Sequence, residues 1–353
     1  MNQRIFHVAV LTLLLMVGVS SGFSQNSSEL KTFLSQRLGL SQDQIAAIQR
    51  GQPFAKNMEP RSPAEIFVVG VVYINAAPES FLKFANDFNN LRSLPFPKYL
   101  TIVKFSNPPQ LSDLKGFGLS SDDVKALREC KPGHCEIQLP SSSAMDELRK
   151  SVNWSAPNVD EQVNQLLQKL ALSRLLEYQK EGNRTLGEVY NDKGQKVNVA
   201  DQFKYMISYY QTLPRDLPAF YKYILDYPSG KPANVEDTFY WDNVNFGLTR
   251  TLRIVHVLTR HGEKPDEPAY VFAEKQLYSS HYFETALDMA YVIRASDDPK
   301  QSGFYLVKAM GCEQAMLTGG FKGSMERRIA ISHSVSDMQK SLAHVKNVLE
   351  RQK

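Results

Sequence analysis

Five consecutive segments with alternating apolar and polar residues, followed by a long amphipathic segment, constrain the fold of this chain more than any other feature. Alternation with a period of two, bounded by Gly, Pro, Asp and Ser, is typical of β-strands. From residue 236 onward we therefore expect five successive strands in an antiparallel meander. They are DTFYWDNVNF (237–246), LTRTLRIVHVLT (248–259), AYVFAEKQLY (269–278), ETALDMAYVI (284–293) and GFYLVKAM (303–310).

The end of the chain predicts a long helix that packs on these strands. A helix opens at Gly319-Gly320, and its apolar residues recur at spacings of four and three: Ile331, Val335, Met338, Leu342, Val345 and Leu349. Such a stripe must be buried against another element, and the meander just before it offers the available surface.

The first part of the chain mixes helices with strands. We expect, in order, a helix over 30–50 with a break before a new N-cap at Ser41, a short strand over 53–57, a strand over 65–75, a helix with Phe81, Phe84, Ala85 and Phe88 on one face, and a strand over 98–106.

The middle of the chain has a helical pattern. Helices are expected over 121–129, 159–180 and 201–227, with loops at EGNRT and NDKGQK between them. Pro214 and Pro218 are expected to bend or divide the last of these helices, because proline interrupts the backbone hydrogen bonds of a helix.

This order of elements resembles the START-like superfamily of lipid-transfer and polyketide-cyclase-like proteins. The resemblance rests on VVGVVYINAAPESFLKFANDF and on the strands and helix from 236 to 352. It implies an α+β fold of the helix-grip type, in which a curved antiparallel sheet packs on the long C-terminal helix around an apolar cavity. Residues 25–353 would form a single domain, with an N-terminal helical segment 25–52 and a helical insertion at about 110–235 that departs from the family's usual arrangement.

The resemblance also implies a ligand between the sheet and the terminal helix. These families share a cavity rather than one chemistry, so no catalytic residue is carried over, and candidates come from the alternation alone. His256 shares a strand face with Leu252 and Ile254. A lone His in such a place is more often a core residue, although a buried imidazole can also orient a polar head group.

A second set of candidate ligand residues lies in the segment FAEKQLYSSHYF. Gln276, Tyr278, His281 and Tyr282 fall within or beside strands, and a tyrosine ring suits the boundary between an apolar ligand and water. The alternative is that the polar residues face solvent, which we expect for Glu274 and Lys275.

The tetrapeptide Arg260-His261-Gly262-Glu263 looks like the Arg-His-Gly signature of histidine phosphatases. In those enzymes the motif follows the first strand of an α/β domain, whereas here alternating strands surround it. The segment HGEKPDEP, with Gly and two Pro between two alternating runs, instead predicts a hairpin loop. Phosphoester hydrolysis through Arg260 and His261 therefore remains an alternative function only.

Three cysteines are present, and two of them lie close together in ECKPGHCEIQLP. Pro132-Gly133 favours a tight turn that would bring Cys130 and Cys135 together as a disulfide. A metal site that uses these two thiols and His134 is the alternative, but no second Cys or His cluster is present to complete four ligands. Cys312 is expected to be a buried free thiol.

Residues 1–24 have the pattern of a secretory signal peptide: Arg4, an uncharged run and small residues near the expected cleavage site. We therefore expect an exported protein, periplasmic or secreted. Loss of Arg4 would reduce the net charge from +4 to +3. This mild charge gives no reason to expect a nucleic-acid partner, and it is compatible with peripheral contact with a membrane.

The function expected from these observations is the binding of a hydrophobic small molecule or lipid. A non-catalytic envelope protein with a filled core is a further alternative. The sequence contains no H-E-x-x-H, G-x-S-x-G or phosphate-binding glycine motif. No catalytic residue, metal site or cofactor is therefore assigned, and the oligomeric state stays open.

Overall fold

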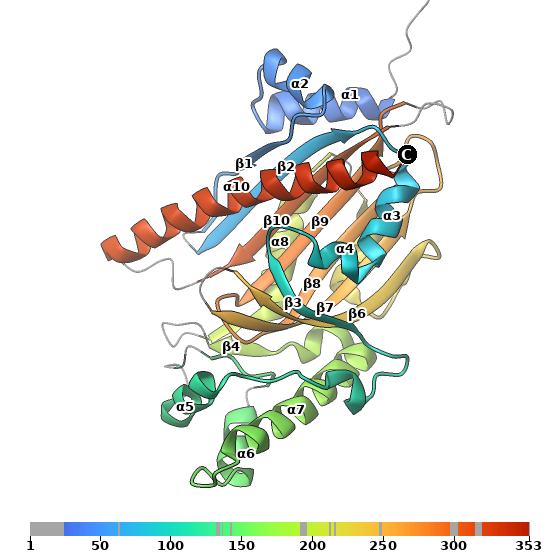
Figure 1. Ribbon diagram of the computed structural model, residues 1–353. Helices are drawn as coiled ribbons and strands as arrows, with labels where there is room; N and C mark the ends of the chain where they lie inside the picture. The colour runs from blue at the N-terminus through green and yellow to red at the C-terminus, as the bar shows by residue number, and fades with distance from the viewer. Residues whose placement is uncertain are drawn as a thin grey trace, which may run out of the picture.

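The computed structural model describes residues 25–62, 64–131, 135, 137–141, 143–190, 196–211, 213–214, 217–246, 249–296, 303–314 and 320–352. These residues form an α+β structure built on an open, eight-stranded antiparallel sheet in the order β1-β2-β10-β9-β8-β7-β6-β3. Figure 1 shows this sheet between helices on either side. The predicted signal peptide, 1–24, lies outside the described residues.

The five predicted strands of the meander are confirmed. They are β6 (Val235–Asn245), β7 (Arg250–His261), β8 (Tyr270–Ser279), β9 (Thr285–Arg294) and β10 (Phe304–Glu313). Each strand pairs with the next one along the chain. The segment after His261 is the expected hairpin loop between β7 and β8.

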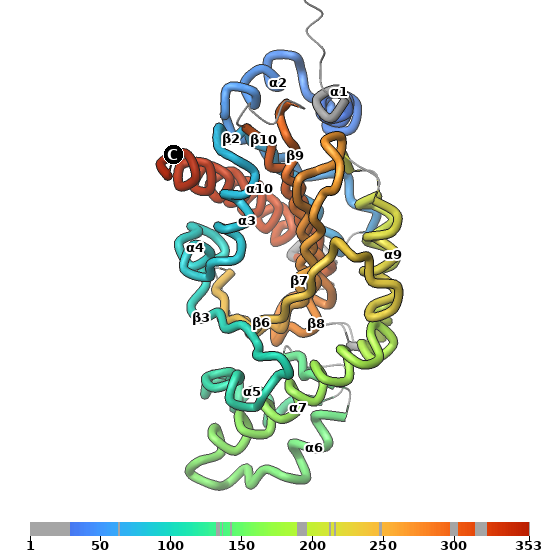
Figure 2. Tube along the Cα trace, turned by 90° about the vertical axis from the view of Figure 1, so that its right-hand side faces the viewer, coloured from blue at the N-terminus to red at the C-terminus, as the bar shows by residue number. Residues whose placement is uncertain are grey.

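Three earlier strands extend the meander at both edges. They are β1 (Phe54–Asn57), β2 (Glu65–Ile74) and β3 (Lys98–Lys104). β2 pairs with β10, and β3 pairs with β6. In Figure 2 the lower part of the sheet, at β6 and β3, turns toward α4 (Phe88–Arg92).

One side of the sheet carries α3 (Pro78–Asn86), α4 and α10 (Gly320–Arg351). The predicted stripe of α10 packs on this side with apolar residues of β2, β10 and α3. A Cβ at Gly70, in the middle of β2, would lie only 2.6 Å from Cγ of Met338 and 2.7 Å from Cδ1 of Leu342. Glycine at this position therefore lets the helix approach the strand closely.

The opposite side of the sheet is covered by the N-terminal helices and by the helical middle of the chain. These elements are α1 (Gln25–Thr32), a π-helical turn (Phe33–Arg37), α2 (Gln42–Gln49), α7 (Val159–Glu181), α8 (Val199–Tyr210) and α9 (Pro218–Asp226). Because both sides are covered, β2 is buried along almost its whole length.

Smaller elements complete the middle segment. They are 3-10 turns at Leu111–Leu114 and Gly182–Thr185, helices α5 (Ser121–Glu129) and α6 (Ala144–Ser151), and a hairpin of β4 (Glu188–Tyr190) and β5 (Lys196–Asn198). The predicted division of the last helix is confirmed, since α8 ends before Pro214 and α9 begins at Pro218. Helix α6 and the hairpin were not predicted.

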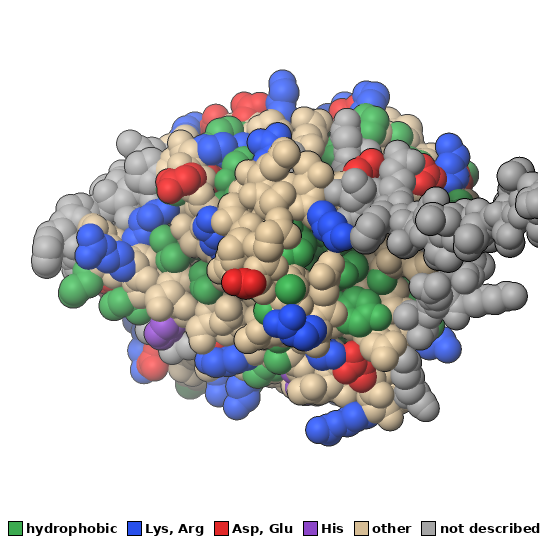
Figure 3. All heavy atoms as spheres, turned by 90° about the horizontal axis from the view of Figure 1, so that it is seen from above, with side chains coloured by type: hydrophobic (Ala, Val, Ile, Leu, Met, Phe, Trp, Pro, Cys, Tyr) green, Lys and Arg blue, Asp and Glu red, His purple; other side chains and the backbone are tan. Residues whose placement is uncertain are grey.

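On the face of the molecule seen in Figure 3, Lys and Arg side chains are interspersed with Asp and Glu. This mixture agrees with the small net charge of +4. Among the described helices, none combines the length and the apolar composition that crossing a bilayer requires.

Candidate functional site

A row of ionisable side chains, one from each strand of the meander, crosses the middle of the α10 side of the sheet. Register places Asp242 opposite Arg253, Glu274 opposite Asp288, and Lys308 opposite Gly70, over which α10 lies. Arg253 is four residues along β7 from Val257, the partner of Glu274, and Lys308 is diagonal to Asp288, so the row runs obliquely across the sheet. Residues paired in this way lie on the same side of a sheet. We call Asp242, Arg253, Glu274, Asp288 and Lys308 the central polar row.

At the β6 end of the row, Arg253 and Asp242 form a bidentate ion pair. Nε and Nη2 of Arg253 donate to the two carboxylate oxygens of Asp242 at 3.0 and 2.6 Å. The Asp242 side chain is fully buried, and that of Arg253 is 12% exposed. Burial raises the pKa of Asp242 even though Arg253 opposes this shift. The positive charge of Arg253 therefore balances the negative charge of Asp242 within one hydrogen-bonded ion pair.

In the middle of the row, two carboxylates face each other across neighbouring strands. Glu274 on β8 is the register partner of Asp288 on β9, and the phenol of Tyr240 donates to Oε2 of Glu274 at 3.2 Å. Burial, together with the nearby Glu274, raises the pKa of Asp288 to about 7 against the opposing effects of Lys308 and Arg253. Like charges directly opposite each other on neighbouring strands destabilise a sheet. We therefore expect this carboxylate pair to lower the stability of the ligand-free protein.

The central polar row is only partly covered. Glu274, Asp288 and Lys308 are each partly exposed, although they lie in the middle of central strands. Their apolar neighbours on the same side are partly exposed as well: Val257, Ala286 and Met310. Helix α10 packs mainly on β1 and β2 and therefore leaves this part of the sheet accessible.

Gln276 lies two residues from Glu274 on the same side of β8, because it pairs with Val255 as Glu274 pairs with Val257. Its side chain is buried, with 5% of the residue exposed. Nε2 donates to the carbonyl oxygen of Phe283 at 3.3 Å, whereas Oε1 has no hydrogen-bond partner among the described residues. The Phe283 carbonyl fixes the orientation of the amide, since a carbonyl can only accept.

Phenylalanine rings surround this end of the row. Phe246 contacts Phe283 with ring centroids 4.9 Å apart and Phe96 with centroids 6.0 Å apart. The guanidinium of Arg253 lies 5.3 Å from the centre of the Phe246 ring. The partly exposed row therefore has apolar and aromatic surface beside it.

A second polar group lies on the other side of the sheet, with His256 fully buried and Asp237 14% exposed. Nε2 of His256 is 2.8 Å from Oδ1 of Asp237, and Nδ1 is 3.0 Å from the phenol oxygen of Tyr178. Because a carboxylate only accepts, Nε2 donates to Asp237 and Nδ1 accepts the Tyr178 proton. Nζ of Lys275 then donates to the Tyr178 oxygen at 3.3 Å.

The groups of this network satisfy one another. Lys275 also donates to Oδ1 of Asn183 and to the carbonyl oxygen of Ile224. Burial lowers the pKa of Lys275 well below its usual range and lowers that of His256 to about 4, although Asp237 opposes the second shift. Lys275 and His256 are 0% exposed, and the partly exposed Asp237 is engaged by Lys231 at 2.7 Å. This network therefore joins α7 to β6, β7 and β8, and its buried His256 and Lys275 offer no surface to a ligand.

Six of the seven predicted ligand residues lie on that side or at the end of the strands, away from the central polar row. Leu252, Ile254 and His256 do share one face of β7, as predicted, but they pack against the helical middle segment rather than α10. His281 and Tyr282 lie in the turn after β8, where Tyr282 accepts from the Thr249 backbone N–H at 2.7 Å.

The sixth of these residues, Tyr278, and the seventh predicted residue, Gln276, differ in their placement. Tyr278, at the end of β8, donates to the carbonyl oxygen of Gln138 at 2.9 Å and belongs to the core on the α7 side. Gln276 is the predicted residue that lies next to the central polar row.

The sequence prediction for Lys275 was wrong. It was expected to face solvent, but it is 0% exposed. Alternation along β8 places Lys275 on the same side as Val271 and Ala273, which are fully buried. This apolar pattern in the sequence could have predicted that Lys275 is buried. The other residues of the central polar row, apart from Glu274, were not singled out in the sequence, because one polar residue per strand is inconspicuous until the strands are aligned.

The residues of the Arg-His-Gly motif lie at the end of β7. Nη2 of Arg260 is 2.5 Å from Oε2 of Glu267 in the same hairpin, and Nε2 of His261 is 3.4 Å from Oε1 of Glu236. Glu267 therefore competes with any phosphate for the guanidinium of Arg260.

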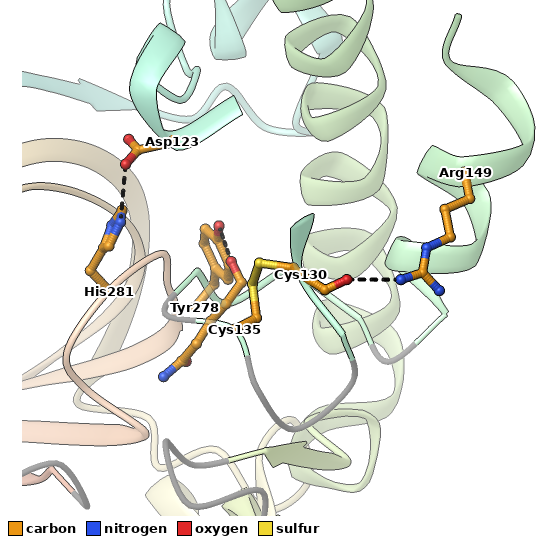
Figure 4. The surroundings of a disulfide bond; sticks show 7 residues. Asp123, Cys130, Cys135, Arg149, Tyr278 and His281 are labelled. Atoms are coloured by element: carbon orange, nitrogen blue, oxygen red, sulfur yellow. Dashed lines mark hydrogen bonds and ion pairs between the residues drawn. A yellow bond between two sulfur atoms is a disulfide. The ribbon is translucent and has the colours of Figure 1, made fainter. Parts of the chain in front are cut away.

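The predicted disulfide between Cys130 and Cys135 is confirmed, and Cys312 is a buried free thiol as expected. Pro132, Gly133 and His134 lie outside the described residues. Figure 4 shows the disulfide beside Tyr278, and the backbone N–H of Gln138 donates to the Ser280 carbonyl at 2.9 Å. The segment just after Cys135 is therefore held at the end of β8 through Gln138.

Within the described part of the chain, no three His, Cys, Asp or Glu side chains gather in a way that could hold a metal ion. No family model matches the chain, and a search of curated proteins found no match. The central polar row therefore has to be interpreted from its own geometry.

Proposed function

We propose that this protein is an exported binding protein that holds a small amphipathic molecule or lipid against the central polar row, between the sheet and helices α3, α4 and α10. The observation that carries the proposal is the partial exposure of Glu274, Asp288 and Lys308 in the middle of the sheet. In the helix-grip families that the sequence resembles, the ligand lies on the same side of the sheet as the terminal helix.

The energetic cost of the row supports this proposal. Charged groups that are partly removed from water destabilise a fold unless they are fully paired, and apolar residues would pack such a position better. Asp242 and Arg253 are paired, but Glu274 lies opposite another carboxylate. A group that costs stability in the free protein is expected where a ligand later compensates the cost.

The apolar neighbours indicate the second half of the ligand. Val257, Ala286 and Met310 are partly exposed on the same side, and Phe246 and Phe283 lie at one end of the row. A hydrocarbon or ring system on these side chains would remove apolar surface from water, at roughly 25 cal/mol per Å².

Export is part of the proposal and rests on the sequence of residues 1–24. The disulfide Cys130–Cys135 supports it, because disulfides persist in oxidising compartments. The alternative of a non-catalytic protein with a filled core predicts no ligand. The phosphatase alternative requires Arg260 to leave Glu267.

The proposal is tested by blocking the surface beside the row. Protein purified from an oxidising compartment is extracted, and co-purifying small molecules are identified by mass spectrometry. Val257→Trp and Met310→Trp are expected to abolish their retention, whereas Leu111→Trp, at a position that is 42% exposed, is the matched control. Equal retention by all four proteins, or a solidly packed interior in an experimental structure, would refute the proposal.

A further inference from the structure

At the Glu274 side of the central polar row, the groups available to a ligand are the carboxylates of Glu274 and Asp288 and the amide oxygen of the neighbouring Gln276, whereas Lys308 is the remaining cation of the row. Oε1 of Gln276 is buried and has no partner among the described residues. The guanidinium of Arg253 is already engaged by Asp242 through two hydrogen bonds. An unsatisfied buried acceptor costs about 1–3 kcal/mol, so a ligand that donates to Gln276 recovers this energy.

The charges of the row also leave one carboxylate uncompensated. Arg253 neutralises Asp242, and Lys308 acts electrostatically on Asp288. Glu274 accepts a hydrogen bond from the neutral phenol of Tyr240 and faces Asp288 across the strand pair. A positive charge placed beside Glu274 and Asp288 would balance the row.

We propose that the ligand carries a protonated amine, which donates hydrogen bonds to Glu274, Asp288 and Gln276 while its apolar part lies along Val257, Met310 and the phenylalanine rings. An ammonium group is a donor with three N–H groups and one positive charge, which matches two carboxylates and one amide oxygen. This inference rests on the proposed binding function and specifies the chemical class of its ligand.

Other ligand classes match the row less well. A carboxylate or phosphate would be repelled by Glu274 and Asp288, and it would leave Oε1 of Gln276 without a donor. An alcohol could donate one hydrogen bond but would bring no charge. The amine is therefore distinguished from both by its charge and by the number of its donors.

The test compares three probes of equal chain length: octylamine, octanol and octanoate. Binding to the ligand-free mature protein is measured by isothermal titration calorimetry at neutral pH. Octylamine is expected to bind about tenfold or more tightly than either other probe, which corresponds to about 1.4 kcal/mol. Glu274→Gln should reduce octylamine affinity by about tenfold and leave octanol affinity unchanged.

Two further variants complete the test. Gln276→Leu, which removes the unpartnered acceptor, should weaken octylamine binding more than octanol binding. Glu236→Gln removes a carboxylate whose side chain is 73% exposed, and it should change neither affinity. Circular dichroism and thermal unfolding of each variant establish that it is folded.

The outcomes separate this inference from the proposed function. If octanol and octylamine bind equally and Val257→Trp blocks both, the binding function stands and the amine inference is overturned. If octanoate binds best, the assigned charge preference is overturned as well. If none of the three probes binds to the folded wild-type protein, both proposals fail.

Discussion

The phenol oxygen of Tyr178, on α7, lies 3.0 Å from Nδ1 of His256, in the middle of β7. This hydrogen bond joins the helical middle of the chain to the meander at a fully buried point. Asp237 binds the other nitrogen of His256, and Lys275 donates to the Tyr178 oxygen. The phenol is therefore both a donor and an acceptor. If it is removed, neither His256 nor Lys275 can form a replacement hydrogen bond with water, because both are buried.

Replacing Tyr178 with Phe is expected to destabilise the protein by about 2 kcal/mol, because it leaves Nδ1 of His256 without a donor and one N–H of Lys275 without an acceptor. The free energy of unfolding is measured by urea denaturation. Tyr205→Phe, at a position that is 37% exposed, serves as the control and should change stability by less than about 0.5 kcal/mol. Equal effects of both substitutions would contradict the role assigned to the network.

The effect of His256→Gln should depend on pH. Burial lowers the pKa of His256 from 6.5 to about 4, so the unfolded chain binds the proton more readily. Its contribution to stability is present above pH 6.5 and is lost as the pH falls from 6.5 toward 4. The stability difference between wild type and variant should therefore be largest at pH 7 and shrink by pH 4.5. A difference independent of pH would show that the imidazole does not titrate in this way.

Asp288→Asn should show the opposite dependence in ligand-free protein. Burial and Glu274 raise the pKa of Asp288 from 3.8 to about 7, against the effect of Lys308 and Arg253. The folded state then holds the proton more tightly, so wild-type stability falls as the pH rises from about 4 to 7.

The Asp288→Asn variant should consequently unfold at a temperature a few degrees higher than wild type at pH 8 and at a similar temperature at pH 5. Asp43→Asn, an exposed position in the first turn of α2, is the control and should show little pH-dependent difference. A lower melting temperature for Asp288→Asn at pH 8 would contradict the raised pKa.

Gly70→Ala tests how closely α10 packs on β2. The added Cβ would lie 2.6 Å from Cγ of Met338 and 2.7 Å from Cδ1 of Leu342, which predicts a loss of about 1–3 kcal/mol. The double variant Gly70→Ala, Met338→Ala should lose less stability than the sum of the losses in the two single variants. The shortened side chain at position 338 no longer clashes with the Cβ added at position 70. Strict additivity in urea denaturation would mean that the helix does not pack against Gly70.

Removing the disulfide with Cys130→Ser and Cys135→Ser is expected to lower stability by roughly 2 kcal/mol, because the closed loop is short. Amide exchange should rise around Gln138, which is held by Ser280 and Tyr278, while ligand binding at the central polar row stays intact. Peptide mapping after alkylation without reductant is the direct check on the bond. Two alkylated thiols would refute it, and stoichiometric zinc would favour the metal site instead.

Local pattern was sufficient to predict much of the secondary structure. The alternation in β6 to β10 and the spacing of Met338, Leu342 and Val345 in α10 involve residues close together in the chain. These patterns can therefore be recognised without knowing which elements pack around them. The capping of α2 by Ser41, with Gln44 completing a capping box, is equally local. The proximity of Cys130 and Cys135 allowed their pairing to be predicted as well.

By itself, then, the sequence determined which residues share a face where the alternation is regular, but only the tertiary structure decided what covers that face and that a bulge places Tyr278 on the opposite side of β8 from Gln276. His256 was correctly grouped with Leu252 and Ile254, yet the helical middle segment rather than α10 packs on them. Lys275 could be buried because Tyr178 and Asn183, distant in the chain, supply its acceptors. The central polar row likewise exists only through the register of five strands, since a period of two fixes side-chain direction within a strand and carries no information about its neighbours.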